Sequence, residues 1–341
     1  MAVVLDANGD SIDTNGNRIM EYGKLKRICI QRIMNGVLMV ALTLLMMGLS
    51  CEGFAAGQTF FESADEAANN LVIAVARDDD TALTHILGQD YRKLLPMGRI
   101  KGDVVDRFLR SWAGFHTLLP KDNKTRMLAV GENGWTFPVP IIKETEGWRF
   151  DTAAGLELMR IRWIGRNELE TMQAVYAYHD AQMEYALKDR DGDGVLEYAQ
   201  KFISSPGKRD GLFWKTTPAE PQSPLGRLFA DASKPKNTYH GYHYRILKSQ
   251  GKYAEGGAYS YLVNGNMVSG FAIVAWPAEY GKTGVMSFML SREGTLYEAD
   301  LGPKSQAVAS AMSKFDPDPR WEPVSEEFTD LGSLRGSKAG P

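Results

Sequence analysis

Residues 164–186 read IGRNELETMQAVYAYHDAQMEYA, and this stretch decides the fold of the second half of the chain. Its apolar residues recur every three or four positions, which is the spacing of one face of a helix. The members of this stripe are Leu169, Met172, Val175, Tyr176, His179, Met183 and Ala186. We therefore expect a long amphipathic helix from about residue 164 to residue 187.

Strand patterns follow this helix after Gly- and Pro-rich connections. They cover residues 241–247, 259–263, 268–274, 284–290 and 295–299. Asn264-Gly265-Asn266 lies between two of these runs and predicts a hairpin turn. A long helix followed by antiparallel strands predicts an α+β domain over residues 161–320, and residues 321–341 are expected to form a flexible tail.

The preceding part, residues 58–160, predicts a separate α+β domain. Ser63 and Glu66 have the spacing of a capping box at the start of a first helix. Further helices are expected at 81–87 and at 103–115, the latter with Phe108, Trp112 and Phe115 as aromatic anchors, and strands at 126–130, 136–143 and 147–151. Helices followed by a curled antiparallel sheet resemble the cone-shaped nuclear-transport-factor-2-like domains.

Residues 1–57 are interpreted as an upstream extension and a secretory signal peptide. Basic residues from Lys24 to Arg32 precede the uncharged apolar run Val37–Leu49, and small residues follow at 53–57. This order of basic head, short apolar core and small residues is typical of an export signal, although a retained membrane anchor is the alternative. Translation is expected to start at Met20 or Met34, and both cysteines, Cys29 and Cys51, lie within this segment.

The composition argues against one class of partner. The chain has 341 residues with 39 Lys+Arg against 42 Asp+Glu, a net charge of −3. Nucleic-acid binding requires clustered excess positive charge, so no nucleic-acid partner is expected. We expect a protein exported to the periplasm or cell envelope of a bacterium, in contact with the membrane only through an uncleaved signal segment.

Seven sequence blocks in a fixed order carry a family resemblance. They are WTFPVPIIKETEGWRFDTAAG (135–155), IGRNELETMQAVYAYHDAQMEYA (164–186), KRDGLFW (208–214), SPLG (223–226), YHGYHYRIL (239–247), QG…GGA (250–258) and GFAIVAWPAEYGKTGVMSF (270–288). Together they resemble the exported bacterial family catalogued as domain of unknown function 2950, over roughly residues 58–325. One departure is Trp163, where the family pattern implies a basic residue. The resemblance implies no particular activity.

A second resemblance covers residues 165–302. The long helix, the acidic loop and the strand meander are similar to the globular part of type IV pilins and pseudopilins. The apolar half of the helix through which pilins assemble is missing from this chain, so the resemblance implies a pilin-like fold without implying a pilus.

The acidic stretch 189–197 is a candidate calcium loop. Asp189, Asp191 and Asp193 alternate and Gly194 follows at the sixth position, so three carboxylates can converge on one ion. Glu197 at the ninth position is a candidate fourth ligand, whereas the twelfth position is Gln200 instead of the Glu of an EF-hand. The alternative is a hydrated acidic turn that carries no ion.

Five further residues are candidate ligand-binding residues: Arg162, Arg166, His240, His243 and Trp276. The two arginines either form ion pairs at a domain junction, with Asp151 as the expected partner of Arg166, or line an anion pocket. His240 and His243 lie three apart in a predicted strand and should point to opposite faces, which argues against a shared metal. Trp276 belongs to an aromatic set that lines either a groove or the core.

These features predict a non-catalytic binding or assembly factor of the cell envelope, whose partner is an envelope protein or polymer. Two alternatives remain open. One is a periplasmic hydrolase that uses His240 or His243 with a nearby carboxylate, and the other is a calcium-stabilised structural subunit of a surface assembly. Calcium is the only cofactor that the sequence suggests.

Overall fold

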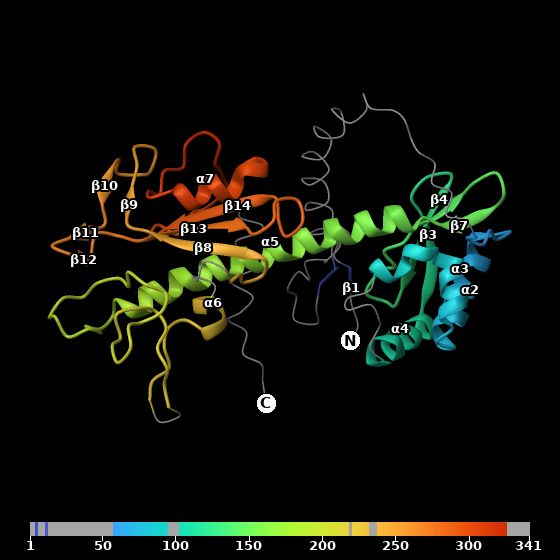
Figure 1. Ribbon diagram of the computed structural model, residues 1–341, viewed down its shortest axis with the longest axis horizontal. Coiled ribbons are helices and arrows are strands. Elements are labelled where there is room, and N and C mark those ends of the chain that lie inside the picture. The colour runs from blue at the N-terminus through green and yellow to red at the C-terminus, as the bar shows by residue number, and fades with distance from the viewer. Residues whose placement is uncertain are drawn as a thin grey trace. The chain divides into compact units, whose positions relative to one another are not determined.

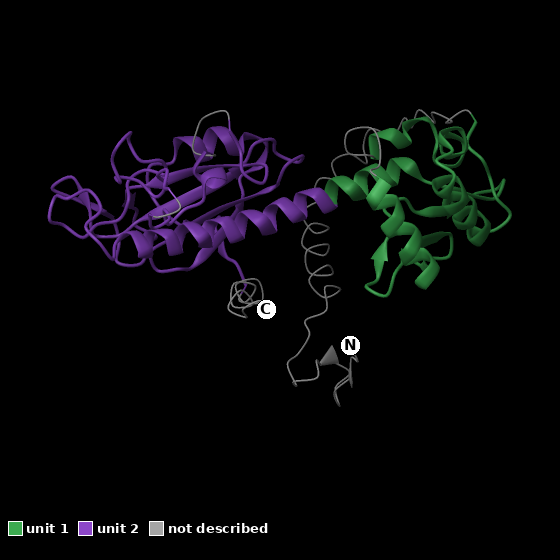
Figure 2. Ribbon diagram, turned by 90° about the horizontal axis from the view of Figure 1, so that it is seen from below, with its two compact units in different colours: residues 1–161 green, residues 162–341 purple. Residues whose placement is uncertain are grey.

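The computed structural model describes residues 57–94, 102–217, 220–231 and 237–325, together with the paired strands β1 (Val4–Leu5) and β2 (Ser11–Ile12). The predicted signal segment, apart from Gly57, lies outside the described residues. The chain divides into two compact units, residues 1–161 and 162–341 (Figure 2). Both combine helices with antiparallel sheet, which confirms the predicted α+β class. Among the described residues, no helix has the length and apolar character that a membrane span requires.

The first unit begins with its helices. They are α2 (Ala64–Ala76), α3 (Asp80–Leu87), the 3-10 helix η1 (Gln89–Leu94) and α4 (Gly102–Gly114). The capping box at the start of α2 is confirmed, because Ser63 Oγ accepts a 3.0 Å hydrogen bond from the Glu66 N–H. The Glu66 carboxylate in turn accepts from the Glu62 N–H at 3.0 Å.

A small antiparallel sheet follows these helices. Its strands are β3 (His116–Pro120), β4 (Thr125–Val130), β5 (Trp135–Thr136), β6 (Ile141–Lys143) and β7 (Trp148–Phe150), ordered β3-β4-β6-β7 with β5 also paired to β4. The prediction of one strand over 136–143 is wrong. Pro138 and Pro140 have no N–H to donate to a ladder, and the strand breaks there into β5 and β6.

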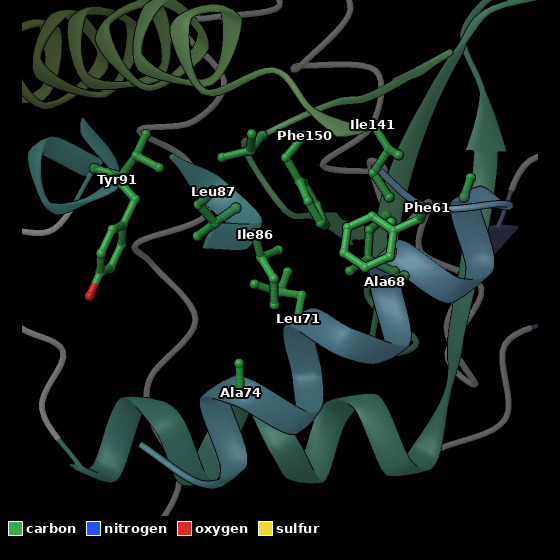
Figure 3. Close-up of a cluster of buried hydrophobic side chains, with 14 of the residues drawn as sticks. Phe61, Ala68, Leu71, Ala74, Ile86, Leu87, Tyr91, Ile141 and Phe150 are labelled. Atoms are coloured by element: carbon green, nitrogen blue, oxygen red, sulfur yellow. The ribbon is translucent and has the colours of Figure 1, made fainter. Parts of the chain in front are cut away.

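The core of this unit lies between α2, α3 and the sheet (Figure 3). Leu71 of α2, Ile141 of β6 and Phe150 of β7 are almost fully buried. Phe108 and Trp112 of α4 pack against this core as predicted. The prediction of Phe115 as a third anchor is wrong, because Phe115 follows the end of α4 and is 49% exposed.

Helix α5 runs from Thr152 to Tyr185, so it begins well before the predicted start near residue 164. Asp151 Oδ1 caps it by accepting a 3.0 Å hydrogen bond from the Ala154 N–H. The helix continues through Gly155, where a Cβ would lie 2.8 Å from Val139 Cγ2. Glycine therefore permits close packing here and does not end the helix.

The second unit is built on a five-stranded antiparallel sheet in the order β16-β15-β14-β13-β8. Its strands are β8 (Tyr242–Leu247), β13 (Ala272–Pro277), β14 (Met286–Ser291), β15 (Leu296–Asp300) and β16 (Glu322–Pro323). Helix α5 covers one face, and α7 (Ser305–Ala311) covers the other (Figure 1). Since β16 pairs with β15 and Trp321 is buried, the sheet includes residues beyond 320.

Short pairs complete this unit. They are β9 (Ser249–Gln250) with β10 (Tyr259–Ser260), and β11 (Leu262–Val263) with β12 (Asn266–Met267), while α6 spans Arg227–Asp231. The predicted hairpin at Asn264-Gly265 is confirmed, because Val263 pairs with Asn266. Both turn residues have positive φ, 51° and 93°, as a two-residue type I′ turn requires. The strand expected over 259–263 is interrupted at Tyr261, and the one expected over 268–274 begins only at Ala272.

Candidate functional site

The acidic loop brings three carboxylates together. Asp189, Asp191 and Asp193 each place one carboxylate oxygen within 4.8 Å of the others, and all three side chains are exposed. Asp189 also orders the loop, since its two oxygens accept hydrogen bonds from the N–H groups of Gly192 (2.7 Å) and Gly194 (3.0 Å). These bonds, that from Gly192 above all, hold the pKa of Asp189 below its usual value.

Arg190, between the first two aspartates, points the other way. Its guanidinium donates to the carbonyl oxygens of Glu184 (3.2 Å) and Tyr185 (3.3 Å) at the end of α5. It also lies 5.5 Å from the centroid of the Trp214 ring, and only 10% of its side chain is exposed. The loop is thus anchored through Arg190, which leaves its acidic side chains outside.

The loop is bound to the β11–β12 hairpin. Asn266 Nδ2 donates to Asp193 Oδ2 at 2.5 Å, and Gln200 Nε2 donates to the Gly265 carbonyl at 2.6 Å. Glu197, the predicted fourth ligand, accepts a 2.9 Å bond from the Met267 N–H and lies outside the group of three carboxylates. Burial raises its pKa. We call residues 187–197 together with this hairpin the tip of the second unit.

Large apolar side chains are exposed at the tip. The exposed fractions are 74% for Leu187, 37% for Val195, 60% for Leu196 and 47% for Val263. These residues lie on the two segments that the bonds of Asp193, Glu197 and Gln200 hold together. The tip therefore carries exposed apolar side chains on the same two segments as a concentrated negative charge. Exposed apolar surface rimmed by polar residues is typical of interaction sites.

Two of the predicted ligand-binding residues, Arg166 and His240, both contact the carboxylate of Glu170. Arg166 Nε donates to Glu170 Oε1 at 2.9 Å, and Glu170 Oε2 lies 2.7 Å from His240 Nδ1. The prediction that Asp151 pairs with Arg166 is wrong, because Asp151 caps α5 whereas Glu170 lies one helical turn beyond Arg166. Glu170 was not among the predicted residues, although its i,i+4 spacing from Arg166 was visible in the sequence.

His240 lies in the turn before β8, so the strand-face argument does not apply to it. His240 and Gly241 have φ of 53° and 74°, and Tyr239 and Tyr242 exchange two backbone hydrogen bonds around them. Histidine tolerates this left-handed conformation better than most residues. The ring of Tyr239 lies 3.9 Å from that of His240, so the imidazole is held by a carboxylate and an aromatic neighbour.

His243 and Trp276 are cross-strand neighbours on β8 and β13. Their ring centroids are 5.7 Å apart, and His243 Nδ1 lies 3.1 Å from the Asn237 carbonyl oxygen. Arg162 lies on α5 one turn before Arg166, and burial lowers the pKa of its guanidinium. The contacts described here thus form two separate groupings in this unit, Arg166 with His240 and His243 with Trp276.

The family model described as protein of unknown function (DUF2950) matches residues 58–324. The chain belongs to this family. The match spans both compact units, including the tip and both histidine groupings. No curated protein matches the chain, and no solved structure matches it.

Proposed function

We propose that this family member is an exported, non-catalytic binding or assembly factor of the bacterial cell envelope, and that the tip of its second unit is the binding surface. The observation that carries the proposal is the exposed apolar surface of Leu187, Val195, Leu196 and Val263 beside three clustered carboxylates. Its partner is an envelope protein or polymer that offers apolar surface with basic groups around it, because such a surface complements the tip in both polarity and charge.

Two leucines make this proposal testable with a matched control. Leu187 at the tip and Leu228 on α6 are both 74% exposed, so serine at either position should leave folding unchanged. The double variant Leu187→Ser/Leu196→Ser should no longer retain the envelope component that wild type retains. Leu228→Ser should retain it at wild-type level. Equal retention by all three proteins would contradict the proposal.

Calcium is the second candidate, favoured by the group of Asp189, Asp191 and Asp193. An ion there would be held by carboxylate oxygens, the ligands that Ca²⁺ prefers, and would neutralise part of the negative tip. Calcium should then raise the Tm of wild type but not that of Asp191→Asn. Asp180→Asn, which removes an 85% exposed carboxylate from α5, is the control and should respond like wild type. A calcium response that persists in Asp191→Asn would reject this loop as the site.

An envelope hydrolase is a third candidate, favoured by the contact between Glu170 and His240. The carboxylate orients the ring through Nδ1, so Nε2 is the nitrogen that would take a proton from water or a hydroxyl. His240→Gln would then abolish hydrolysis of an ester or amide probe, and His243→Gln would not. Equal hydrolysis by both variants would exclude a catalytic role for His240.

Two finer fold relationships belong to the same proposal. The order of helices and then antiparallel sheet in the first unit supports a cone-like, nuclear-transport-factor-2-like domain. The packing of α5 against an antiparallel sheet supports a pilin-like second domain. Both are consistent with non-catalytic roles, but the function assigned to the tip does not depend on them.

A further inference from the structure

The two faces of the second unit's sheet differ sharply in chemistry. Glu298 opposes Phe288 and Glu322, and Asp300 opposes Met286, so these three carboxylates share one face of the sheet. That face is covered by α5, because Tyr244, which shares it through Ala275, donates to Thr171 Oγ1 of α5. Opposed residues share a face, and residues two apart along a strand do so as well. The five strands therefore contribute no carboxylate to the face covered by α7.

That second face carries hydrogen-bond donors in one row. Arg245 of β8 identifies the face, because its guanidinium donates to the Ser310 carbonyl at the end of α7. His243 lies two residues earlier and pairs with Trp276. The last pair of β13 with β14 is Ala275 with Phe288, and Trp276 and Ser287 are the next residues beyond it on the two strands. His243, Trp276 and Ser287 thus lie on three neighbouring strands of this face.

Two of these donors are buried without an acceptor. Trp276 is 6% exposed and Ser287 is fully buried. Within the described part of the chain, neither Trp276 Nε1 nor Ser287 Oγ has a hydrogen-bond partner. A buried donor that lacks an acceptor costs stability, so two on adjacent strands point to an acceptor that arrives from outside the protein.

The chemistry of the row selects its ligand. An indole N–H can only donate, and the serine hydroxyl can donate as well. With Arg245 on this face and the strands' carboxylates on the other, the row favours a negatively charged acceptor. The ring of Trp276, 5.7 Å from that of His243, adds an apolar wall. β8 is an edge strand, so the row reaches the margin of the sheet at His243.

We propose that Trp276, Ser287 and His243 form a binding site for a small carboxylate-bearing molecule on the face of the sheet covered by α7. One oxygen of the carboxylate accepts from Trp276 Nε1 and Ser287 Oγ, and the ring of His243 borders the site at the outer end of the row. This site is independent of the tip, and its ligand does not depend on the partner proposed there.

The proposal predicts an unusual stability pattern. Ser287→Ala removes a hydroxyl that has no acceptor among the residues the structure describes, so dialysed Ser287→Ala should melt no lower than wild type. Binding residues commonly reduce the stability of the unliganded protein in this way. If Ser287 instead donates to a protein group, the same variant should melt lower, and that result would overturn the proposal.

Binding can be followed at the indole itself. Full-length protein is labelled with 15N, and Trp276→Phe identifies the Trp276 indole N–H among those of the 7 tryptophans. Sodium acetate and sodium succinate are the probes, with sodium chloride at the same ionic strength as reference. At least one of the two carboxylates should shift the Trp276 indole N–H resonance downfield until the shift saturates, and should raise the Tm of the protein. Ser287→Ala should weaken this response at least tenfold.

Trp214→Phe is the matched control, because Trp214 Nε1 is also buried and has no hydrogen-bond partner in the described segments, but its ring contacts Arg190 and Arg209 instead of the row. It should respond to carboxylate as wild type does. If the Trp276 indole signal is unchanged by both carboxylates and shows magnetisation transfer from a bound water, the row holds water only. That result would overturn the proposal. An equal response in Ser287→Ala would overturn it too.

Discussion

Asp193 of the acidic loop accepts a 2.5 Å hydrogen bond from Asn266, which lies 73 positions later in the hairpin turn. This contact joins the two segments that carry the exposed apolar residues of the tip. It places the acidic charge and the apolar surface on one local structure. The geometry of the proposed binding surface therefore depends on the contact between the loop and the hairpin.

Asn266→Ala should loosen the tip without unfolding the unit. The bond is exposed, so its loss should lower the free energy of unfolding by about 1 kcal/mol or less. Proteolytic cleavage within residues 189–197 should nevertheless become faster, because local opening costs less than global unfolding. Limited proteolysis with mass spectrometry measures this. Asn69→Ala, at an exposed position of α2, should cleave at the wild-type rate.

Glu168 should make stability depend on pH. It is buried on α5, where Oε1 accepts bonds from the N–H groups of Val285 (2.8 Å) and Met286 (3.0 Å). Burial, reinforced by Glu298 and Asp300, raises its pKa from 4.5 to about 7. Because the folded pKa lies above the unfolded one, the stabilisation is complete below pH 4.5 and is lost as the pH rises through 7.

Glu168→Gln removes this titration. Relative to the variant, wild type should lose up to about 3 kcal/mol of unfolding free energy between pH 4.5 and pH 8. Urea denaturation at a series of pH values measures the difference. Glu293→Gln, at an exposed position, is the control and should follow wild type. A constant difference between wild type and Glu168→Gln across this range would show that Glu168 does not titrate there.

Alanine substitutions at Gly241 and Gly265 should distinguish the cost of a left-handed backbone from the cost of steric crowding. Gly241 and Gly265 both have positive φ, 74° and 93°. A Cβ at Gly241 would lie 2.9 Å from Asn167 Nδ2 and from Thr283 Cβ, whereas one at Gly265 would meet nothing within 4 Å. Both alanine variants should lose roughly 1–2 kcal/mol from the left-handed backbone. Gly241→Ala should lose about a further 1–3 kcal/mol through overpacking, as thermal or urea unfolding would show. Equal losses would contradict the close approach of α5 to this turn.

Local signals in the sequence predicted much of the fold. The capping box at Ser63 and the hairpin at Asn264-Gly265 each depend on neighbouring residues, and each is confirmed. The long helix also forms, but the predicted stripe is not its buried face: of the seven members only Val175 is buried, and Met183 is 43% exposed. α5 starts at Thr152, before the predicted residue 164, and Gly155 in its first turn lies against Val139, which is a contact between elements. Pro138 and Pro140 lack the N–H groups that a strand ladder requires, which breaks the strand between β5 and β6, but the length of the break depends on the pairing within the sheet.

In the candidate site, too, local sequence patterns predicted some features, and contacts distant in sequence determined the others. The convergence of Asp189, Asp191 and Asp193 follows from alternation along the chain, and it is observed. Glu197 turns to the Met267 N–H, a partner 70 positions away that no local pattern indicates. The position of Ser287 on the strand next to Trp276 depends on the pairing of β13 with β14, which no local pattern indicates. Tertiary contacts therefore decide the residues that the sequence patterns missed.

The central claim, that the tip is the binding surface, is tested most directly by photo-crosslinking in intact cells. A photoreactive benzoylphenylalanine is placed at position 196 of the tip or at position 228 of α6, which are exposed by 60% and 74%. The account predicts a discrete adduct from position 196 that Leu187→Ser weakens, and no such adduct from position 228. Adducts of the same size and yield from both positions, or from position 228 alone, would contradict it.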